Sequence, residues 1–584
     1  MKSLVKKIVA ILTVTALIGS LGACKSGSGK DPDTTGTPAV TATPTDTVTS
    51  APTSEPVKDT PTTEPTAEPV TPEPTDEPAV PTQDPVLSAV PENIVISTRE
   101  GFDSDWNTEQ NKSNGYYSYD YPVLDEKCAE KYPKLAEAFE QYRIEKEDNT
   151  ESVLEDIRMA AVSDEVYGEY FAKNDLTIIR ADSNIVCVRY DYYYYTGGLH
   201  GSSGTYSYCW DPVSGERIIG LADIVTDKEK LIFCVYDYLM SKYDEDDFFV
   251  DDLKEYMRIG FDDGGLAYEI GYNYLSIIFN AGDITAHYIG KVNVDIPFKG
   301  NETMFNPKYL AAPDNYMVYI GDYYNFRTDL LNDGEVDTLD FYTDYVNEYE
   351  EFDGFTCYLN EIPVSKTFGF DYSAYELDPY YIHANGKDYL YMTIWFDSED
   401  TETYAYRIDM FENGYDDNAP DNPWGDIVEI DHGNLWDFAG DASYDPMDMV
   451  MSCRHDMIGT NFIKGRFCVG YDGLPELLDK DYTFTVGYEL TVIKPLTLME
   501  VTFETGEGLG MVDISENEVL SMYRTDGATF VDLLRNVDGH DTLVRLDMEE
   551  ERLYFDDGED YYSTYNIRGI DDPNEVFSGI GYAD

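Results

Sequence analysis

The sequence predicts an α+β protein rich in β-strands, preceded by a secretion signal and a long linker. Apolar residues at helical spacing occur in three stretches between residues 133 and 240, whereas alternating Tyr, Val and Ile recur along most of the remaining chain. Aromatic residues make up 14% of the chain, with 51 tyrosines, a composition typical of strands. A chain of 584 residues normally divides into several domains.

The acidic excess excludes some classes of partner. The chain has 40 basic and 114 acidic side chains, which gives a formal net charge of −74. Nucleic-acid binding relies on Lys and Arg to neutralise phosphates, so this class is disfavoured, as is docking of the protein surface on anionic lipid. The charge favours a basic or cationic partner.

The first residues form a targeting segment. Lys2, Lys6 and Lys7 precede an apolar run at 8–18 that is too short for an ordinary membrane span. The segment Leu21-Gly22-Ala23-Cys24 resembles the bacterial lipobox. That resemblance implies a signal peptide over 1–23, a lipidated Cys24 as the new N-terminus, and an extracytoplasmic protein anchored to the cell membrane, surface-exposed. The alternative is a plain secretory signal with a chance cysteine.

Residues 24–94 are predicted to be a disordered linker rich in Thr, Pro and Glu. Fourteen of the 28 prolines lie between Pro32 and Pro91. Such a segment buries too little apolar surface to offset its ordering entropy, and it favours extended polyproline II. At roughly 3.1 Å per residue, about 60 residues of it reach at most ~190 Å, which suits a tether that holds folded domains away from a membrane.

Residues 95–305 are predicted to be one α+β domain. Leu135, Phe139 and Tyr142 repeat at helical spacing after Pro133, and a second helix is expected around 154–161. Alternation predicts strands at 186–194, 206–210 and 292–296, with a turn at 211–215. A capping-box pattern of Thr226 and Glu229 predicts the start of a third helix.

Three motifs of this domain carry a family resemblance: Gly197-Gly198-Leu199-His200-Gly201, Asp211-Pro212-Val213-Ser214-Gly215-Glu216 and Leu221-Ala222-Asp223-Ile224. They resemble the extracellular domain shared by the RsiV-type anti-sigma factor and the PdaC-type peptidoglycan deacetylase, with Leu199, Ser214 and Glu216 departing from the family pattern. The resemblance implies an accessory, non-catalytic domain, which in the anti-sigma factor binds lysozyme.

The same motif region supplies the candidate ligand-binding residues Tyr195, Gly197, Gly198 and His200. Tyrosines give amphipathic contact area for sugars or proteins, and His200 lies in a glycine-rich turn. The alternative is structural: the tyrosines at 192–195 would alternate between core and sheet surface, and the paired glycines would serve an unusual backbone turn.

Residues 310–480 are predicted to be a β-rich domain. The segment 329–337 (DLLNDGEVD) resembles the calcium loop of VCBS/FG-GAP repeats. Asp329, Asp333 and Asp337 would supply the hard oxygen ligands that Ca²⁺ prefers. Leu331 occupies a position that normally holds a ligand, so a solvated acidic turn is the alternative.

Residues 481–584 are predicted to be a small β domain, loosely SH3-like. Apolar and aromatic residues alternate over 482–492, and Asp-Gly pairs at 526–527, 538–539 and 557–558 are hairpin signals.

No arrangement typical of catalysis was found, so no enzyme is predicted. The six histidines lack zinc spacing, and the eight cysteines include no C-x-x-C pair. Cys187, Cys209 and Cys234 are interpreted as small core residues, and a Cys453–Cys468 disulfide is left open. Neighbouring carboxylates, such as Asp437 and Asp441, are too common in this chain to indicate a glycosidase.

These observations predict a non-catalytic cell-surface lipoprotein that binds an envelope component, such as peptidoglycan or another glycan, or a cationic protein such as lysozyme. The alternatives are a structural or assembly lipoprotein that makes protein contacts, and a glycan-acting enzyme.

Overall fold

The protein was analysed as a computed structural model. The structure describes residues 90–581 except 109–111, 164–169, 198–200, 321–324, 332, 346–350, 364–367, 397–400, 411–424, 435, 439–441, 444, 486–487, 555–560 and 571. The predicted signal peptide, Cys24 and nearly all of the predicted linker lie outside the described residues. The described part belongs to one compact unit. None of its helices is both long enough and apolar enough to span a bilayer.

The first sheet has seven strands in the order β20-β1-β2-β3-β4-β5-β6. Its strands are β1 (Ile96–Asn107), β2 (Lys112–Leu124), β3 (Tyr170–Asp182), β4 (Ile185–Tyr195), β5 (Ser202–Trp210), β6 (Arg217–Ile218) and β20 (Ala442–Ser443). Strands β2 and β3 are parallel, so the chain between them must cross over, and it does so through α2 (Glu126–Lys131) and α3 (Pro133–Ser163). The strands predicted at 186–194 and 206–210 are confirmed as β4 and β5.

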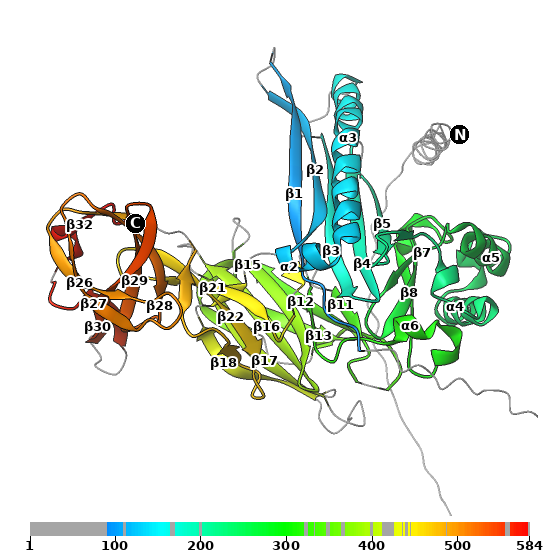
Figure 1. Cartoon of the computed structure of the whole chain (residues 1–584). Coiled ribbons are helices and arrows are strands. Elements are labelled where there is room, and N and C mark those ends of the chain that lie inside the picture. The colour runs from blue at the N-terminus through cyan, green and yellow to red at the C-terminus, as the bar shows by residue number, and fades with distance from the viewer. Residues whose placement is uncertain are drawn as a thin grey trace, which may run out of the picture. The chain divides into compact units, whose positions relative to one another are not determined.

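Helix α3 lies along one face of this sheet (Figure 1). It is one helix of 31 residues, so the prediction of two separate helices is wrong. The segment between the two apolar stretches is polar but contains no Pro or Gly, and nothing in it ends the helix. Leu135 and Phe139 pack into one buried cluster under the sheet, and Leu154 and Ile157 pack into another.

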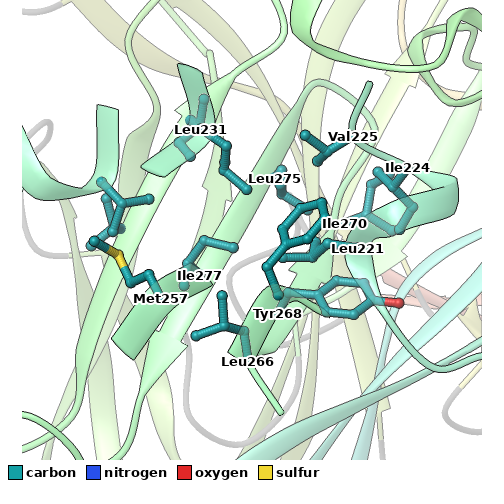
Figure 2. Packing of buried hydrophobic residues seen from close by; sticks show 14 of the residues in the cluster. Leu221, Ile224, Val225, Leu231, Met257, Leu266, Tyr268, Ile270, Leu275 and Ile277 are labelled. Carbon is teal, nitrogen blue, oxygen red and sulfur yellow. The ribbon is translucent and has the colours of Figure 1, made fainter. Parts of the chain in front are cut away.

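A second layer of helices and strands follows. It comprises η2 (Leu221–Asp223), α4 (Lys228–Lys242), η3 (Glu245–Asp247), α5 (Leu253–Asp263), β7 (Ala267–Ile270), β8 (Tyr274–Phe279), η4 (His287–Ile289), β9 (Val292–Pro297), η5 (Glu302–Met304) and α6 (Pro307–Leu310). Strands β7, β8 and β9 form a three-stranded sheet, and β9 confirms the strand predicted at 292–296. Figure 2 shows Leu231 of α4 and Met257 of α5 in the same buried cluster as Leu275 and Ile277 of β8.

Helix α4 starts one residue later than the sequence pattern indicated. Its N-cap is Asp227, whose side chain accepts from the Lys230 amide, rather than Thr226. The Thr226 amide donates to the Met304 carbonyl instead, and Glu229 pairs with Arg258 at 2.9 Å. The predicted helix is therefore confirmed, but its capping box is wrong.

The second sheet has nine strands and runs β11-β12-β13-β15-β16-β17-β18, with β10 paired to β15 and β14 to β13. The strands are β10 (Tyr316–Tyr319), β11 (Asn325–Thr328), β12 (Asp337–Tyr345), β13 (Phe352–Leu359), β14 (Ile362–Pro363), β15 (Phe368–Ala384), β16 (Lys387–Phe396), β17 (Thr401–Met410) and β18 (Gly425–Asn434). In β16, Leu390 and Met392 enter one core cluster while Tyr389 and Tyr391 enter another. This central strand is thus buried on both faces.

The third sheet has thirteen strands along the path β19-β21-β22-β24-β28-β29-β30-β26-β27. The strands are β19 (Asp437–Phe438), β21 (Met449–His455), β22 (Asn461–Val469), β23 (Pro475–Leu477), β24 (Tyr482–Phe484), β25 (Glu489–Val492), β26 (Leu496–Val501), β27 (Gly508–Ile514), β28 (Val519–Thr525), β29 (Phe530–Val537), β30 (His540–Tyr554), β31 (Tyr561–Ile567) and β32 (Phe577–Ser578), with η6 (Pro573–Glu575) before the last. The strand-rich α+β character predicted from the sequence is confirmed.

The third sheet crosses the predicted boundary at 480–481, because Ile463 of β22 pairs with Phe484 of β24. The alternation over 482–492 belongs to two strands, β24 and β25, rather than one. The predicted hairpin at Asp538-Gly539 is confirmed: Val537 pairs with His540, and both turn residues have positive φ, as a two-residue hairpin turn requires. Asp557-Gly558 lies outside the described residues, and the SH3-like description stays a prediction.

One fully buried arginine joins the first sheet to the segments that follow it. Arg180 of β3 donates from Nε to Asp182 at 2.7 Å. Its other nitrogens donate to the carbonyls of Gly271 at 3.0 Å, Tyr309 at 2.8 Å and Ala311 at 2.6 Å. The side chain therefore satisfies carbonyls from two separate segments while its charge is balanced by Asp182.

We expect Arg180→Met to destabilise the protein strongly, because it would leave the Asp182 carboxylate buried without its counter-charge. Removal of one partner of a buried pair typically costs about 3–5 kcal/mol. The measurement is the urea midpoint followed by circular dichroism. Arg143→Met on α3, which breaks exposed pairs with Glu140 and Glu147, is the control and should cost less than about 1 kcal/mol. Equal midpoints for the two variants would contradict this role.

Candidate functional site

The face of the first sheet opposite α3 carries a set of aromatic side chains. The register pairs Tyr116 of β2 with Phe171 of β3, and Phe171 with Tyr195 of β4, so these three residues share a face. The alternation of side chains places the other members of the set on the same face. We call the following residues the aromatic face: Phe102, Trp106, Tyr116, Phe171, Tyr193 and Tyr195.

The rings of the aromatic face stack on one another across four strands. The Phe102 and Tyr116 centroids are 5.6 Å apart, as are those of Tyr116 and Phe171, and the planes of the latter pair differ by 11°. Phe171 in turn lies 5.5 Å from Tyr193. Phe102 is 62% exposed, Trp106 55% and Tyr193 39%. The result is a contiguous ladder of large side chains in contact with solvent.

Stacking limits what this surface can bind. Tyr116 lies between Phe102 and Phe171 in an offset stack with centroid separations of 5.6 Å, so its two ring faces are partly covered. A sugar that stacks on an aromatic residue needs an open ring face. Ring edges and tyrosine hydroxyls instead offer apolar area and hydrogen bonds, the combination that aromatic residues bring to protein interfaces. The inner rings of Tyr116 and Phe171 thus suit contacts through their edges, whereas Phe102, Trp106 and Tyr193 remain exposed.

Carboxylates outnumber cations on this face of the sheet. The register places there Glu100, Asp120, Asp175 and Asp191, against Lys173 and Arg189, and Lys291 lies 3.9 Å from Asp191. Arg189 and Asp191 pair with each other at 2.9 Å, so this cation is already neutralised within the protein. The Ser118 hydroxyl donates to Glu100 at 2.7 Å and holds that carboxylate in place. The surface around the rings is thus apolar and acidic.

A contact with α3 fixes the outer part of the β1–β2 hairpin. Asp105 of β1 accepts from Asn114 at 2.6 Å and from Arg158 of α3 at 3.0 Å. Burial raises the pKa of Asp105, but the hydrogen bonds from Asn114 and Arg158 outweigh burial and leave the pKa below its usual value. The ionised carboxylate therefore holds the hairpin against the helix, which positions the neighbouring Trp106 on the opposite face.

The tyrosine run at 192–195 divides between the two faces as alternation requires. Tyr193 is exposed on the aromatic face, whereas Tyr194 packs beside the cluster under α3 and burial raises its pKa to about 12. Tyr192 stacks on Tyr206 at 6.0 Å on the helix side. The structural interpretation of the run is correct, and it also brings Tyr193 and Tyr195 to a candidate binding surface.

Two of the four predicted ligand-binding residues can be placed. Tyr195 ends β4, 6.0 Å from Phe171 of the aromatic face, and its ring also stacks on Tyr170 of the cluster under α3 at 6.3 Å. Gly197 has φ of 100°, which fits the predicted role of glycine in an unusual turn. Gly198 and His200 lie outside the described residues, so their part in binding stays a prediction.

Sequence reasoning missed most of the aromatic face. Phe102, Trp106, Tyr116 and Phe171 were not identified because they lie on three different strands, one of them after a long helix. The alternation within 116–121 could have revealed β2, but no local signal shows that β2 pairs with β3 in parallel.

Two of the predicted calcium ligands, Asp329 and Asp337, accept hydrogen bonds from backbone amides. Asp329 accepts from the amides of Asp333 at 3.0 Å and Gly334 at 3.2 Å. Asp337 accepts from the amides of Leu330 and Leu331, both at 2.9 Å, and burial raises its pKa. The part of the chain that the structure describes contains no group of three or more His, Cys, Asp or Glu side chains suited to a metal ion. The contacts fit the alternative of an acidic turn, while calcium binding stays a prediction.

A cavity opens where β3, β8, β10 and β11 meet, with about 430 Å³ of space including its open mouth. Its lining includes Tyr274 and Arg327. The Arg327 guanidinium is bonded to Glu269 and lies 3.0 Å from Asp295. Since both carboxylates already hold this cation, the cavity presents no unpaired arginine to an anionic ligand.

One carboxyl group has a strongly shifted pKa. Burial and the nearby Asp378 raise the pKa of Asp437 in β19 to about 7. Such a pair can serve as acid and base in glycosidases. Here, however, the oxygens of Asp378 accept from Tyr319 at 2.8 Å and Trp395 at 3.0 Å, so they are directed at protein donors. Asp441, the neighbour noted in the sequence, lies outside the described residues.

Comparisons with known proteins give limited similarity. No family model matches the chain, and no curated protein matches it. Among solved structures, a DUF3298 family member from Bacteroides fragilis NCTC 9343 aligns with 17% identity and a TM-score of 0.26, covering 37% of this chain and 96% of that one. A DUF3298 family protein from Pseudomonas aeruginosa PAO1 aligns with 11% identity and a TM-score of 0.27, covering 38% of this chain and 98% of that one.

We expect Asp437→Asn to stabilise the protein, and more so at pH 8 than at pH 5. Because the folded pKa is raised from 3.8 to about 7, the folded state retains a proton that the unfolded state loses, and stability falls as pH rises through this window. The variant removes this loss, so its stabilising effect should be larger at pH 8 than at pH 5 by about 2–3 kcal/mol. Thermal melts at both pH values test it, with the exposed Asp246→Asn as control; a pH-independent effect would contradict it.

Proposed function

We propose that this protein is a non-catalytic, extracytoplasmic lipoprotein that binds a cationic protein through the aromatic face. In this proposal Cys24 carries the lipid anchor and residues 25–94 hold the folded part away from the membrane. The observation that carries the proposal is the solvent-exposed ladder of stacked rings bordered by carboxylates.

Charge supports a basic partner. The net charge of −74 creates a negative potential that attracts cationic proteins and speeds their encounter. Charge alone gives weak and unselective attraction, which salt screens. The aromatic face adds apolar area that a partner can bury, and large aromatic side chains supply most of the binding energy in many protein interfaces. The two features together fit a selective site for a basic protein.

Lysozyme is the probe we choose, because it is basic and because the motifs at 197–224 resemble a domain that binds it. The resemblance also motivates the envelope location, where such a protein would be met. Peptidoglycan is the competing ligand; the covered ring faces of Tyr116 and Phe171 argue against stacking of its sugars there.

We expect the double variant Phe102→Ser/Tyr193→Ser to weaken lysozyme binding by roughly 10- to 100-fold, because truncation of a central aromatic anchor costs about 1–2 kcal/mol or more. Isothermal titration at low and high salt measures the change. The matched control is Tyr288→Ser/Tyr471→Ser, which removes two aromatic side chains that are 81% and 83% exposed elsewhere. It should bind lysozyme as the unaltered protein does.

Two results would contradict the proposal that lysozyme binds to the aromatic face. One is equal affinity for lysozyme and for an unrelated protein of similar basic charge, such as cytochrome c, with both lost at high salt. The other is unchanged affinity of the Phe102→Ser/Tyr193→Ser variant. Binding of purified peptidoglycan that this variant abolishes would instead favour the glycan.

We expect Cys24→Ala to abolish lipidation and release the protein from the membrane fraction, because no acceptor thiol would remain in the lipobox-like segment. Fractionation of cells and metabolic labelling with a fatty acid measure the two effects. Cys128→Ala, at a buried cysteine of α2, is the control and should remain acylated and membrane-bound. A Cys24→Ala protein that is still acylated would refute the anchor.

A further inference from the structure

Two cysteines face each other across neighbouring strands of the first sheet. The register of β4 and β5 places Cys187 directly opposite Cys209. Both are buried, with exposed fractions of 0% and 1%, and both are thiols in this structure. The Cys209 side chain lies within hydrogen-bonding contact of the Cys187 thiol, and burial followed by this contact raises the pKa of Cys187 well above its usual value.

The geometry of directly opposed residues suits a covalent bond. In an antiparallel pair the Cα atoms are separated by about 5.5 Å or about 4.5 Å, according to whether the pair is hydrogen-bonded. Disulfides span Cα separations of about 4.4–6.8 Å. The pairing therefore places the Cα atoms of Cys187 and Cys209 within the range that a disulfide spans.

The disulfide left open from the sequence, between Cys453 and Cys468, does not share this geometry. Cys453 of β21 pairs with Ile463 of β22, whereas Cys468 lies five residues further along β22. At about 3.4 Å per residue, that offset places the two residues roughly 17 Å apart along the strand. The Cys453–Cys468 bridge is therefore wrong for this register.

We propose that Cys187 and Cys209 form a disulfide in the mature extracytoplasmic protein. The proposal rests on the location given under the proposed function, because disulfides persist in oxidising compartments and are rare in the cytosol. It assigns a bond to two residues that the sequence indicated only as small core side chains.

The bond requires an oxidised thiol-disulfide carrier as co-reactant. The thiolate of one cysteine attacks the carrier disulfide, forms a mixed disulfide and releases one carrier thiolate. The thiolate of the second cysteine then attacks the sulfur of the first cysteine in this mixed disulfide and releases the second carrier thiolate. Two thiol protons and two electrons are transferred in all, so the carrier ends as a dithiol. Burial in the folded sheet would block the carrier, so this exchange occurs before β4 and β5 are enclosed.

The bond would fasten the strand that carries part of the aromatic face. It would close a loop that contains residues 188–208 and would join β4 and β5 at a fixed register. Tyr193 and Tyr195 follow Cys187 on β4, so slippage of this strand would displace both rings. The covalent link would therefore hold the binding surface as well as reduce the conformational freedom of the unfolded chain.

The first experiment tests the pair itself. The mature full-length chain with Cys24→Ser is reduced, unfolded and refolded in a glutathione redox buffer, then alkylated in denaturant and digested. Mass spectrometry should find peptides linked through Cys187 and Cys209 and alkyl groups on the other five cysteines of the described region. Cys453→Ala should keep the link, and Cys187→Ala/Cys209→Ala should lack it. If the folded protein carries alkyl groups on both cysteines, the proposal is overturned.

The second experiment tests the location separately. Wild-type protein is alkylated during lysis of its own cells, before any thiol can exchange, and the same peptides are analysed. A link here supports the proposal. A link after refolding but free thiols in the cell-derived protein would overturn the oxidising location and, with it, the bond in the cell. Lysozyme titration of the refolded, linked protein would still report on the binding site by itself.

Discussion

The Arg180 guanidinium is the interaction on which the arrangement of the described parts depends. It lies inside the protein, pairs with Asp182, and takes the carbonyls of Gly271, Tyr309 and Ala311 as further partners. A buried carbonyl without a partner is costly, and so is a buried charge without a counter-charge. All of these groups are satisfied only when the first sheet, the β7–β8 turn and the C-terminal end of α6 with the residue that follows it meet in one geometry. The ion pair thus specifies an arrangement that nonspecific apolar contact would leave open.

Other arginines are likewise paired with carboxylates inside the protein. Arg327 is buried against Glu269 and Asp295, and Arg524 and Arg545 both contact the fully buried Asp532. With only 40 basic residues against 114 acidic ones, each arginine used inside removes a cation from the surface. Together with Arg180, these arginines pair with an equal number of carboxylates (Asp182, Glu269, Asp295 and Asp532), so the acidic excess of the chain remains outside these pairs. The negative potential around the protein follows from the excess of acidic over basic residues in the chain.

The aromatic face shows how cross-strand packing shapes an exposed surface. Cross-strand stacking orients the rings so that each covers the face of the next, which stabilises a sheet surface without a helix over it. The same orientation partly covers the ring faces of Tyr116 and Phe171 and leaves their edges toward solvent. Strand β4 contributes both to this surface and to the buried face around Cys187, so stability and binding are coupled through one strand.

Local patterns in the sequence determined the elements whose signal is continuous along the chain. The period of two over 186–194 and 206–210 gave β4 and β5, and the apolar spacing after Pro133 gave the start of α3, because each reflects the geometry of one segment. The Asp538-Gly539 turn followed equally from backbone conformation. Tertiary structure alone decided that β2 and β3 pair in parallel, that β20 joins the first sheet from far along the chain, and that Asp329 and Asp337 accept from backbone amides. It also brought Phe102, Tyr116 and Phe171 together and set Cys187 against Cys209. Strand pairing and register are contacts between distant segments, and the free energy that selects them comes from the whole core rather than from any local stretch of residues.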